Sequence, residues 1–175
     1  MRGTIMIPRK IISKRIVGSR RGSKGVTLIE ILIAVLLLSL GLLGMAGLQI
    51  RALQGNHSAA QRSQAVMLSY FIIEAMRVDS ASAKALNYNT GSLDANGNVD
   101  NSICNVDAIT GTALSDNNQK AWISAIKGSL GDATDTSTCG AINCDADGIC
   151  TVQVRWDDSL AGGLGSQAVT TSTRL

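Results

Sequence analysis

One long uncharged apolar run limits more than any other feature how this chain can fold. From Ile31 to Ile50 there is no charged side chain, and only Ser39 and Gln49 are polar. A helix needs about 20 apolar residues to cross a bilayer, so the run has the length of one transmembrane span. The sequence therefore predicts a single-pass membrane segment within residues 26–50.

The charged residues are divided unequally on the two sides of this run. Residues 1–25 carry eight basic residues and no acidic one, whereas residues 26–175 carry 8 basic and 13 acidic residues, a net charge of −5. Positive charge beside a membrane helix stays in the cytoplasm, so we expect the body of the chain to be exported. The body has no basic patch with interleaved aromatic residues, and the sequence therefore does not predict nucleic-acid binding.

All four cysteines lie in the part that we expect to be exported: Cys104, Cys139, Cys144 and Cys150. Cysteines pair in the oxidising environment outside the cytoplasm, and their spacing here fits no zinc-binding pattern. Four cysteines permit three pairings. The segment between Cys144 and Cys150 is typical of a hairpin turn, which would place these two opposite one another and leave Cys104 to pair with Cys139.

Two simple interpretations of the apolar run leave one residue unexplained. A cleavable secretory signal would be cut near Met45-Ala46-Gly47, but the run is longer than the usual ~7–15-residue core of such a signal. A plain membrane anchor has the right length. Neither accounts for Glu30, because a carboxylate beside the hydrocarbon region is costly and usually marks a functional site with a partner for the charge.

The residues around Glu30 support a third interpretation. The sequence Gly25-Val26-Thr27-Leu28-Ile29-Glu30 resembles the processing motif of type IV prepilins, with Val26 where that family usually has Phe or Met. The resemblance implies that prepilin peptidase cuts between Gly25 and Val26 on the cytoplasmic face and methylates the new N-terminus. It also implies that Glu30 pairs with the amino terminus of a neighbouring subunit during assembly. On a helix, Val26 and Glu30 would lie four residues apart on one face.

The helical pattern continues past the apolar run and predicts one helix from about Thr27 to about Val78, ~75 Å long. Because this length exceeds the bilayer thickness, we expect the second part of the helix to pack on the exported domain. The expected packing stripe consists of Leu53, Ala60, Met67, Leu68, Phe71, Ile72 and Ala75. The predicted organisation is a cleaved leader (1–25), a long helix (26–79, with 26–50 in the membrane and 51–79 on the sheet) and a periplasmic domain (80–175).

Within that domain, Ser115–Leu130 predicts a short amphipathic helix capped by Ser115 or Asp116. Ile149–Trp156 alternates as a strand does, and Gln167–Thr173 is expected to be a second strand. The expected apolar faces are Ala121, Trp122, Ala125 and Ile126 in the helix, and Cys150, Val152, Val154 and Trp156 in the strand. Together with the long helix, these elements predict an α+β fold of the type IV pilin kind, with the helix packed on a small antiparallel sheet.

The sequence offers little support for bound metal or catalysis. Residues 94–100 and 145–148 have the composition of calcium loops but not the EF-hand spacing, and the same residues form tight turns. We therefore expect no metal and no cofactor, and we expect Asp157-Asp158 to form a solvated turn. With His57 as the single histidine, and without a nucleophile motif or a phosphate-binding loop, the sequence does not predict an enzyme.

A second resemblance narrows the functional hypothesis. The segment Leu68–Asp79, Trp122 in its short helix, and Val152–Asp158 (VQVRWDD) resemble the type IV pilus modification proteins, the PilV-type minor pilins. This resemblance implies a minor pilin that helps to initiate pilus assembly with other minor pilins, the major pilin and the inner-membrane assembly platform. Such a protein is an inner-membrane precursor that later enters the extracellular pilus. The alternatives are a pseudopilin of type II secretion and an anchored periplasmic binding module.

Overall fold

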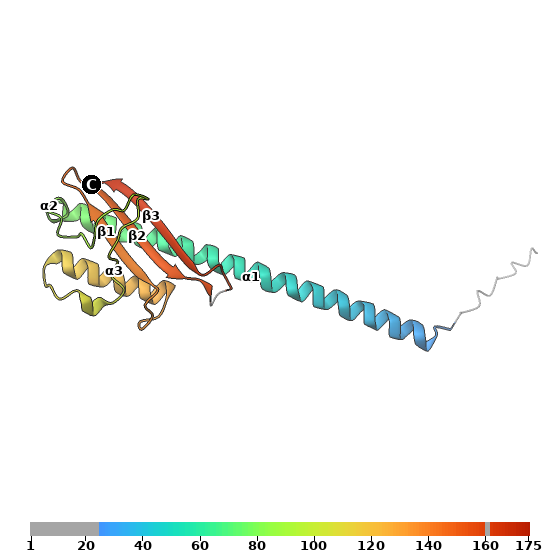
Figure 1. Cartoon of the computed structure of the whole chain (residues 1–175). Helices are drawn as coiled ribbons and strands as arrows, with labels where there is room; N and C mark the ends of the chain where they lie inside the picture. Colours follow the sequence, from blue (N-terminus) through green and yellow to red (C-terminus); the bar gives the residue numbers. More distant parts are fainter. Residues whose placement is uncertain (1–24, 160–161) are drawn as a thin grey trace, which may run out of the picture. The chain divides into compact units, whose positions relative to one another are not determined.

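The computed structural model of the chain describes residues 25–159 and 162–175, so the basic part of the expected leader, residues 1–24, lies outside the described residues. The elements in chain order are α1 (Leu28–Val78), α2 (Ser80–Lys84), the short 3-10 helix η1 (Val106–Ala108), α3 (Leu114–Leu130), β1 (Cys139–Cys144), β2 (Ile149–Asp157) and β3 (Ser166–Arg174) (Figure 1). A long N-terminal helix followed by a small three-stranded antiparallel sheet confirms the predicted α+β, pilin-like architecture.

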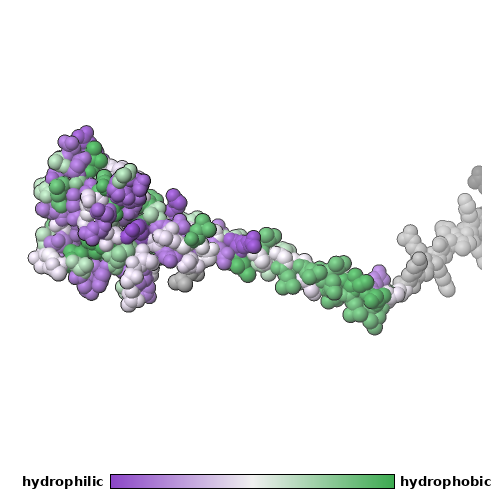
Figure 2. All heavy atoms as spheres, viewed as in Figure 1, coloured by the Kyte–Doolittle hydropathy of each residue, from purple (hydrophilic) through white to green (hydrophobic). Residues whose placement is uncertain are grey.

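The chain divides into two units, Met1–Leu43 and Gly44–Leu175. In the first unit, every large apolar side chain of α1 is exposed, from Leu28 at 76% to Leu43 at 69%. Figure 2 shows these hydrophobic side chains around the first turns of α1. By length and composition, α1 is the one helix in the described part of the chain that could cross a membrane. Apolar side chains exposed on all sides of a helix are what a lipid environment requires.

The second unit contains the sheet, whose strand order is β1-β2-β3. The β1–β2 hairpin pairs Cys144 with Cys150, and its turn closes through a 3.0 Å bond from the Asp145 N–H to the Ile149 carbonyl. Gly148 has φ +80° in this turn, a conformation that glycine adopts without steric cost. The hairpin and both C-terminal strands therefore agree with the sequence expectation.

The core lies between the sheet, α3 and the second part of α1. The expected inward face of β2 is confirmed, since its four members are buried in the core: Cys150, Val152, Val154 and Trp156. The expected stripe of α1 is confirmed in part: Ile72 is buried and Leu68 and Ala75 pack against the core, but Leu53, Ala60, Met67 and Phe71 are exposed. The buried residues of α1 are Ala65, Ser69, Ile72, Ile73 and Met76, whereas Met67 is 63% and Phe71 50% exposed.

The packed face of α1 differs from the predicted one because it includes a buried serine. The true stripe follows Ala65, Ser69, Ile72 and Met76 at helical spacing, and Ser69 is fully buried within it. Its hydroxyl donates to the Ala65 carbonyl at 2.9 Å, so burial leaves no polar atom without a partner. A reading that follows the largest apolar side chains selects the neighbouring face instead.

Helix α3 packs its apolar face on both α1 and β1. Trp122 is fully buried, and its indole N–H donates to the Leu68 carbonyl of α1 at 2.9 Å. A Cβ at Gly140 would lie 2.6 Å from the Trp122 ring, so only glycine lets β1 approach so closely. Trp122 and Ile126 are buried as expected, but Ala121 is exposed and Ile123 is buried in its place.

The start of α3 also differs from the expectation. The N-cap residue is Ala113, which has no side-chain acceptor of its own. The Asp116 carboxylate accepts a hydrogen bond from the Ala113 N–H at 2.9 Å, while Ser115 is buried. Asp116 therefore stabilises the N-terminal end of α3 from within its first turn, where the helix dipole also favours a negative charge.

The Asn- and Asp-rich stretch after α2 is ordered along the sheet rather than being a free loop. The Thr90 N–H donates to the Ile142 carbonyl at 2.8 Å, and Ile103 exchanges backbone bonds with Gly140 at 2.7 and 2.9 Å. The Gln153 side chain of β2 donates to Asn98 at 2.9 Å. The stretch thus covers the outer edge of β1 and the second face of β2.

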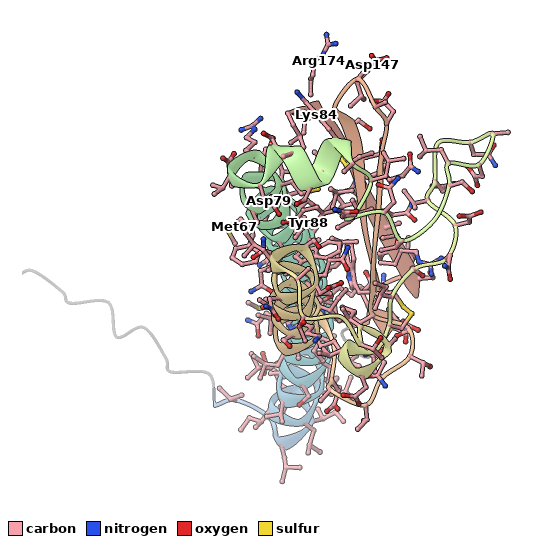
Figure 3. The ribbon with its side chains drawn as sticks, turned by 90° about the vertical axis from the view of Figure 1, so that its left-hand side faces the viewer. Met67, Asp79, Lys84, Tyr88, Asp147 and Arg174 are labelled. Carbon is pink, nitrogen blue, oxygen red and sulfur yellow. A yellow bond between two sulfur atoms is a disulfide. The ribbon has the colours of Figure 1, made fainter. Side chains whose placement is uncertain are left out.

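Tyr88 joins this stretch to the helices. Its hydroxyl donates to the Asp79 carboxylate at 3.2 Å and accepts from the Asn118 amide of α3 at 2.7 Å (Figure 3). Tyr88 is fully buried, and burial raises the pKa of its phenol above the ordinary value. Tyr88 therefore makes this stretch a packed connection between the end of α1 and α3.

Candidate processing and assembly site

The expected cleavage point lies just before the first turn of α1. Gly25, Val26 and Thr27 precede the helix, which begins at Leu28, and all three are exposed. A Cβ placed on Gly25 would meet nothing within 4 Å. The Gly25–Val26 bond is therefore a non-helical, accessible peptide bond, as a peptidase requires of its substrate.

Thr27 begins the helix, a role that the sequence reading missed. Its carbonyl accepts from the N–H groups of Glu30 and Ile31 at 3.1 and 3.3 Å, and its hydroxyl accepts from the Glu30 N–H at 3.4 Å. The order Thr27-x-x-Glu30 is the capping-box pattern, so the signal was present in the sequence. The structure contains one of the two bonds of this box, the bond from the Glu30 N–H to the Thr27 hydroxyl.

Glu30 lies in the first turn of α1, where its negative charge favours the helix dipole. In the precursor Val26 precedes the helix, which begins at Leu28, so the expectation that Val26 and Glu30 share one helix face after cleavage stays a prediction. Within the described residues, the single ion pair is Arg77 with Glu74 at 2.6 Å. Glu30 therefore has no basic partner among the residues that the structure describes, and it is surrounded by exposed apolar side chains.

The comparison with protein families matches this region. Residues 20–46 match the model of the prokaryotic N-terminal methylation motif. The motif is a type IV prepilin leader, and it indicates a pilin-like protein or pseudopilin that prepilin peptidase processes. The leader and the apolar helix that follows fit a precursor anchored in the inner membrane. No curated protein and no solved structure matches the chain.

The four cysteines form two disulfides, Cys104–Cys139 and Cys144–Cys150, which is the pairing that the sequence predicted. The first bridge closes a separation of 35 residues and holds the stretch along β1, and the second spans the hairpin with a separation of 6 residues. Both bridges lie within the second unit. Each bridge restricts the unfolded chain of this unit.

The carboxylates of the Asp-rich turns accept hydrogen bonds from their own backbone. Asp94 accepts from the N–H groups of Asn96 and Asn98, both at 2.8 Å, and the bond from Asn98 is the main reason why its pKa is lowered. In the described part of the chain, no group of three or more His, Cys, Asp or Glu side chains is arranged to hold a metal ion. The Asp-rich segments are therefore explained by turn geometry.

A shallow cleft of about 520 Å³ next to α1 is also lined by carboxylates that accept hydrogen bonds within their own turns. Its acidic residues include Asp135 and Asp157. Burial raises the pKa of Asp135, but hydrogen bonds from Thr138 and Ser137 outweigh this and hold it well below its usual range. Hydrogen bonds from Ser159 likewise lower the pKa of Asp157. Both carboxylates are ionised acceptors that shape their turns.

The prediction that Asp158 lies in a solvated turn is wrong, because Asp158 is only 1% exposed. Its carboxylate accepts from the Ser58 hydroxyl of α1 and from the Gly165 N–H, both at 2.8 Å. A Cβ on Gly163 would lie 2.1 Å from this carboxylate, so the glycine-rich turn before β3 wraps around it. Asp158 thereby joins α1 to the end of β2 and the start of β3.

We predict that Asp158→Ala destabilises the second unit by about 2–3 kcal/mol, because two buried donors lose a charged acceptor. For a domain of this size the melting temperature should fall by roughly 8–20 °C. Thermal unfolding of the full chain in detergent, followed by tryptophan fluorescence, measures this change. Asp157→Ala is the matched control, since Asp157 is exposed and bonds only to its own turn. Equal melting temperatures for the two variants would contradict the assigned role.

Proposed function

We propose that this chain is a minor pilin of a type IV pilus. Prepilin peptidase cuts its inner-membrane precursor between Gly25 and Val26 and methylates the new N-terminus, and the mature protein enters the pilus at low copy number. There it helps to initiate assembly with other minor pilins, the major pilin and the inner-membrane assembly platform. Its role is structural rather than enzymatic.

One observation carries this proposal: the accessible Gly25–Val26 bond lies directly before an apolar helix that bears a carboxylate in its first turn. Cleavage there would remove the eight basic residues of the leader and create an ammonium group at Val26. The helix and Glu30 would remain in the mature chain. An anchor or a secretory signal gives no reason for this order of glycine, helix start and glutamate.

In this proposal each of four segments of the chain has its own role. Residues 1–25 are the leader, residues 26–50 span the membrane, residues 51–79 pack on the sheet, and residues 80–175 form the periplasmic domain. Two disulfides suit an oxidising compartment outside the cytoplasm. Thr27 starts the helix only two residues after the cut, so the mature N-terminus would be almost fully helical.

We predict that Gly25→Arg blocks processing and that full-length precursor accumulates in the membrane. An arginine side chain at the cut would prevent the close approach of the scissile backbone to the peptidase that glycine allows. In the unmodified chain, mass spectrometry should find a methylated N-terminus at Val26.

Gly22→Arg is the matched control, because it makes the same substitution in the leader and leaves Gly25 in place. This variant should be processed normally. A mature protein that still starts at Met1, or that starts near Gly47, would refute the assignment. A correctly cut chain that sediments with a secretion apparatus and not with sheared pili would favour a pseudopilin.

A further inference from the structure

Strand β3 has one edge that pairs with no other strand among the residues that the structure describes; we call it the free edge. In an antiparallel ladder, residues alternate between bonding to the neighbouring strand and pointing away from it. The Asp158 N–H donates to the Gly165 carbonyl at 3.0 Å, and the Leu175 N–H donates to the Gly148 carbonyl at 2.9 Å. Gly165 and Leu175 thus bond toward β2, and so do the odd-numbered residues between them. The residues whose backbone groups point outward are Ser166, Ala168, Thr170, Ser172 and Arg174.

These five outward-pointing residues are exposed, and within the described residues none donates a backbone hydrogen bond to another segment. Natural sheets protect such an edge with proline, lysine, a bulge or a covering segment. The strand SQAVTTSTR contains neither proline nor lysine, and it pairs with β2 without a bulge over nine residues. The opposite edge of the sheet is covered, because Thr90 and Ile103 bond to β1.

Helix α1 runs beside β3 in the same direction. Ser58 bonds to Asp158 just before the start of β3, and Arg77 approaches Thr173 near its end at 3.4 Å. Tyr70 lies two turns before Arg77, on the same face of α1, and is 52% exposed. Because Arg77 reaches Thr173, helical spacing puts the exposed Tyr70 on the side of α1 that faces the β3 edge.

A second copy of this chain does not suit the edge. Its own free strand is β3, and two β3 strands paired antiparallel around a twofold axis would point their α1 helices in opposite directions. Copies anchored in one membrane enter it in the same direction. Since the β1 edge is covered, the second copy offers no other free strand among the described residues. Antiparallel self-pairing is therefore excluded for copies anchored in one membrane, and we assign the edge to a segment of a different protein.

The charges at the edge define the occupant further. Arg174 is the single charged residue of β3 and lies at its end, close to the β1–β2 turn that carries Asp147 (Figure 3). Asp157 pairs with Ser166 at the other end of the strand. Between these ends the outward residues are small and uncharged. A complementary strand is therefore uncharged in its middle, with an acidic residue opposite Arg174 and a basic residue beside Asp157.

We propose that the free edge of β3 binds an extended segment of a different pilin-type subunit, which adds a fourth strand to the sheet. Backbone bonds to the five outward residues hold the segment, and its alternate side chains lie toward Tyr70. The identity of the partner as a pilin-type subunit rests on the proposed function. The strand pairing itself does not.

Hydrogen exchange resolved to single residues tests the pairing. The full chain is compared as a purified protein in detergent, in membrane vesicles from producing cells, and in sheared fibres. The amides of Ala168, Thr170, Ser172 and Arg174 should exchange roughly tenfold or more slowly in vesicles or fibres than in detergent. The amides of Val169 and Thr171 already bond to β2 and should change little. Equal rates for the outward amides in all three samples would overturn the proposal.

A proline at an outward position supplies the matched variant. Ala168→Pro removes one outward N–H and leaves the ladder to β2 intact, as edge strands tolerate. Ala168→Thr keeps that N–H at the same position. The proline variant should lose the protection of Thr170 and Ser172 in vesicles and fibres, whereas the threonine variant should keep it. Both should melt within a few degrees of the parent chain, and unchanged protection in the proline variant would overturn the proposal.

Two further measurements distinguish self-pairing from pairing with a different subunit, and failure of this proposal from failure of the proposed function. Protection of β3 in the purified chain alone, rising with its concentration, would indicate self-pairing and overturn the assignment to a different subunit. The N-terminus of each sample is determined by mass spectrometry. A chain that starts at Met1 refutes the proposed function, while the exchange comparison in vesicles still decides whether the edge is occupied.

Discussion

Glu30→Ala is expected to leave cleavage after Gly25 intact and to abolish co-assembly with partner pilins. After cleavage, the ammonium group of a neighbouring subunit would lie in apolar surroundings, and the Glu30 carboxylate is the proposed counter-charge. Removing one member of such a buried pair costs roughly 3–5 kcal/mol, because the other charge stays without a partner. Co-purification with tagged partner pilins and the number of fibres per cell measure the loss.

A second role for Glu30 calls for a control that separates the two effects. Glu30 also lies in the first turn of α1, where its charge stabilises the helix by about 0.3–1 kcal/mol. Glu30→Gln keeps the shape and the capacity to accept hydrogen bonds but removes the charge. If charge pairing drives assembly, the glutamine variant should fail as completely as the alanine variant. Normal fibres with Glu30→Gln would show that assembly does not need the charge of Glu30.

Loss of the Cys104–Cys139 bridge is expected to destabilise the second unit more than loss of the Cys144–Cys150 bridge. The sequence separations are 35 and 6 residues, so the longer bridge restricts the unfolded chain more. The chain-entropy relation gives about 4 kcal/mol for the long loop and about 2.4 kcal/mol for the short one. The difference corresponds to roughly 6–12 °C in melting temperature for a domain of this size.

The cleanest comparison removes both cysteines of a bridge, so that no free thiol remains. Cys104→Ser with Cys139→Ser should lower the melting temperature of the full chain more than Cys144→Ser with Cys150→Ser. Non-reducing peptide mapping of the parent chain checks the pairing itself. A main product that links Cys104 to Cys150, or Cys139 to Cys150, would contradict both the structure and the stability order.

Much of the secondary structure was predictable because its signals are local. The apolar run and the helical spacing that follows it predicted α1 from about Thr27 to about Val78, and the structure has Leu28–Val78. Alternation predicted β2 with its buried face, and the Asp-Gly turn predicted the hairpin and the Cys144–Cys150 pair. The Gly25–Glu30 motif predicted a prepilin leader, and the match to the methylation motif at residues 20–46 supports that leader, while the cut between Gly25 and Val26 stays a prediction.

The predictions that failed depend on contacts between distant segments. Met67 and Phe71 are larger and more apolar than Ala65 and Ser69, yet the smaller pair is buried. Residues that allow α1 to approach the sheet closely decide which face packs, and α1 alone cannot reveal this. Asp158 shows the same dependence, since its partners Ser58 and Gly165 come from elements far apart in the chain.

The sequence by itself determined that the chain carries a prepilin leader motif, which segment is apolar enough for a membrane, and which segments form helix or strand. These properties follow from the order of neighbouring residues, because helix periodicity, strand alternation and turn chemistry act over a few positions. Only the tertiary structure decided which face of α1 packs, that Asp158 is buried, and that, in the described part of the chain, the β1 edge is covered while the β3 edge is not. Those outcomes depend on shape complementarity and hydrogen bonds across 50 to 100 residues of chain, for which no local pattern exists.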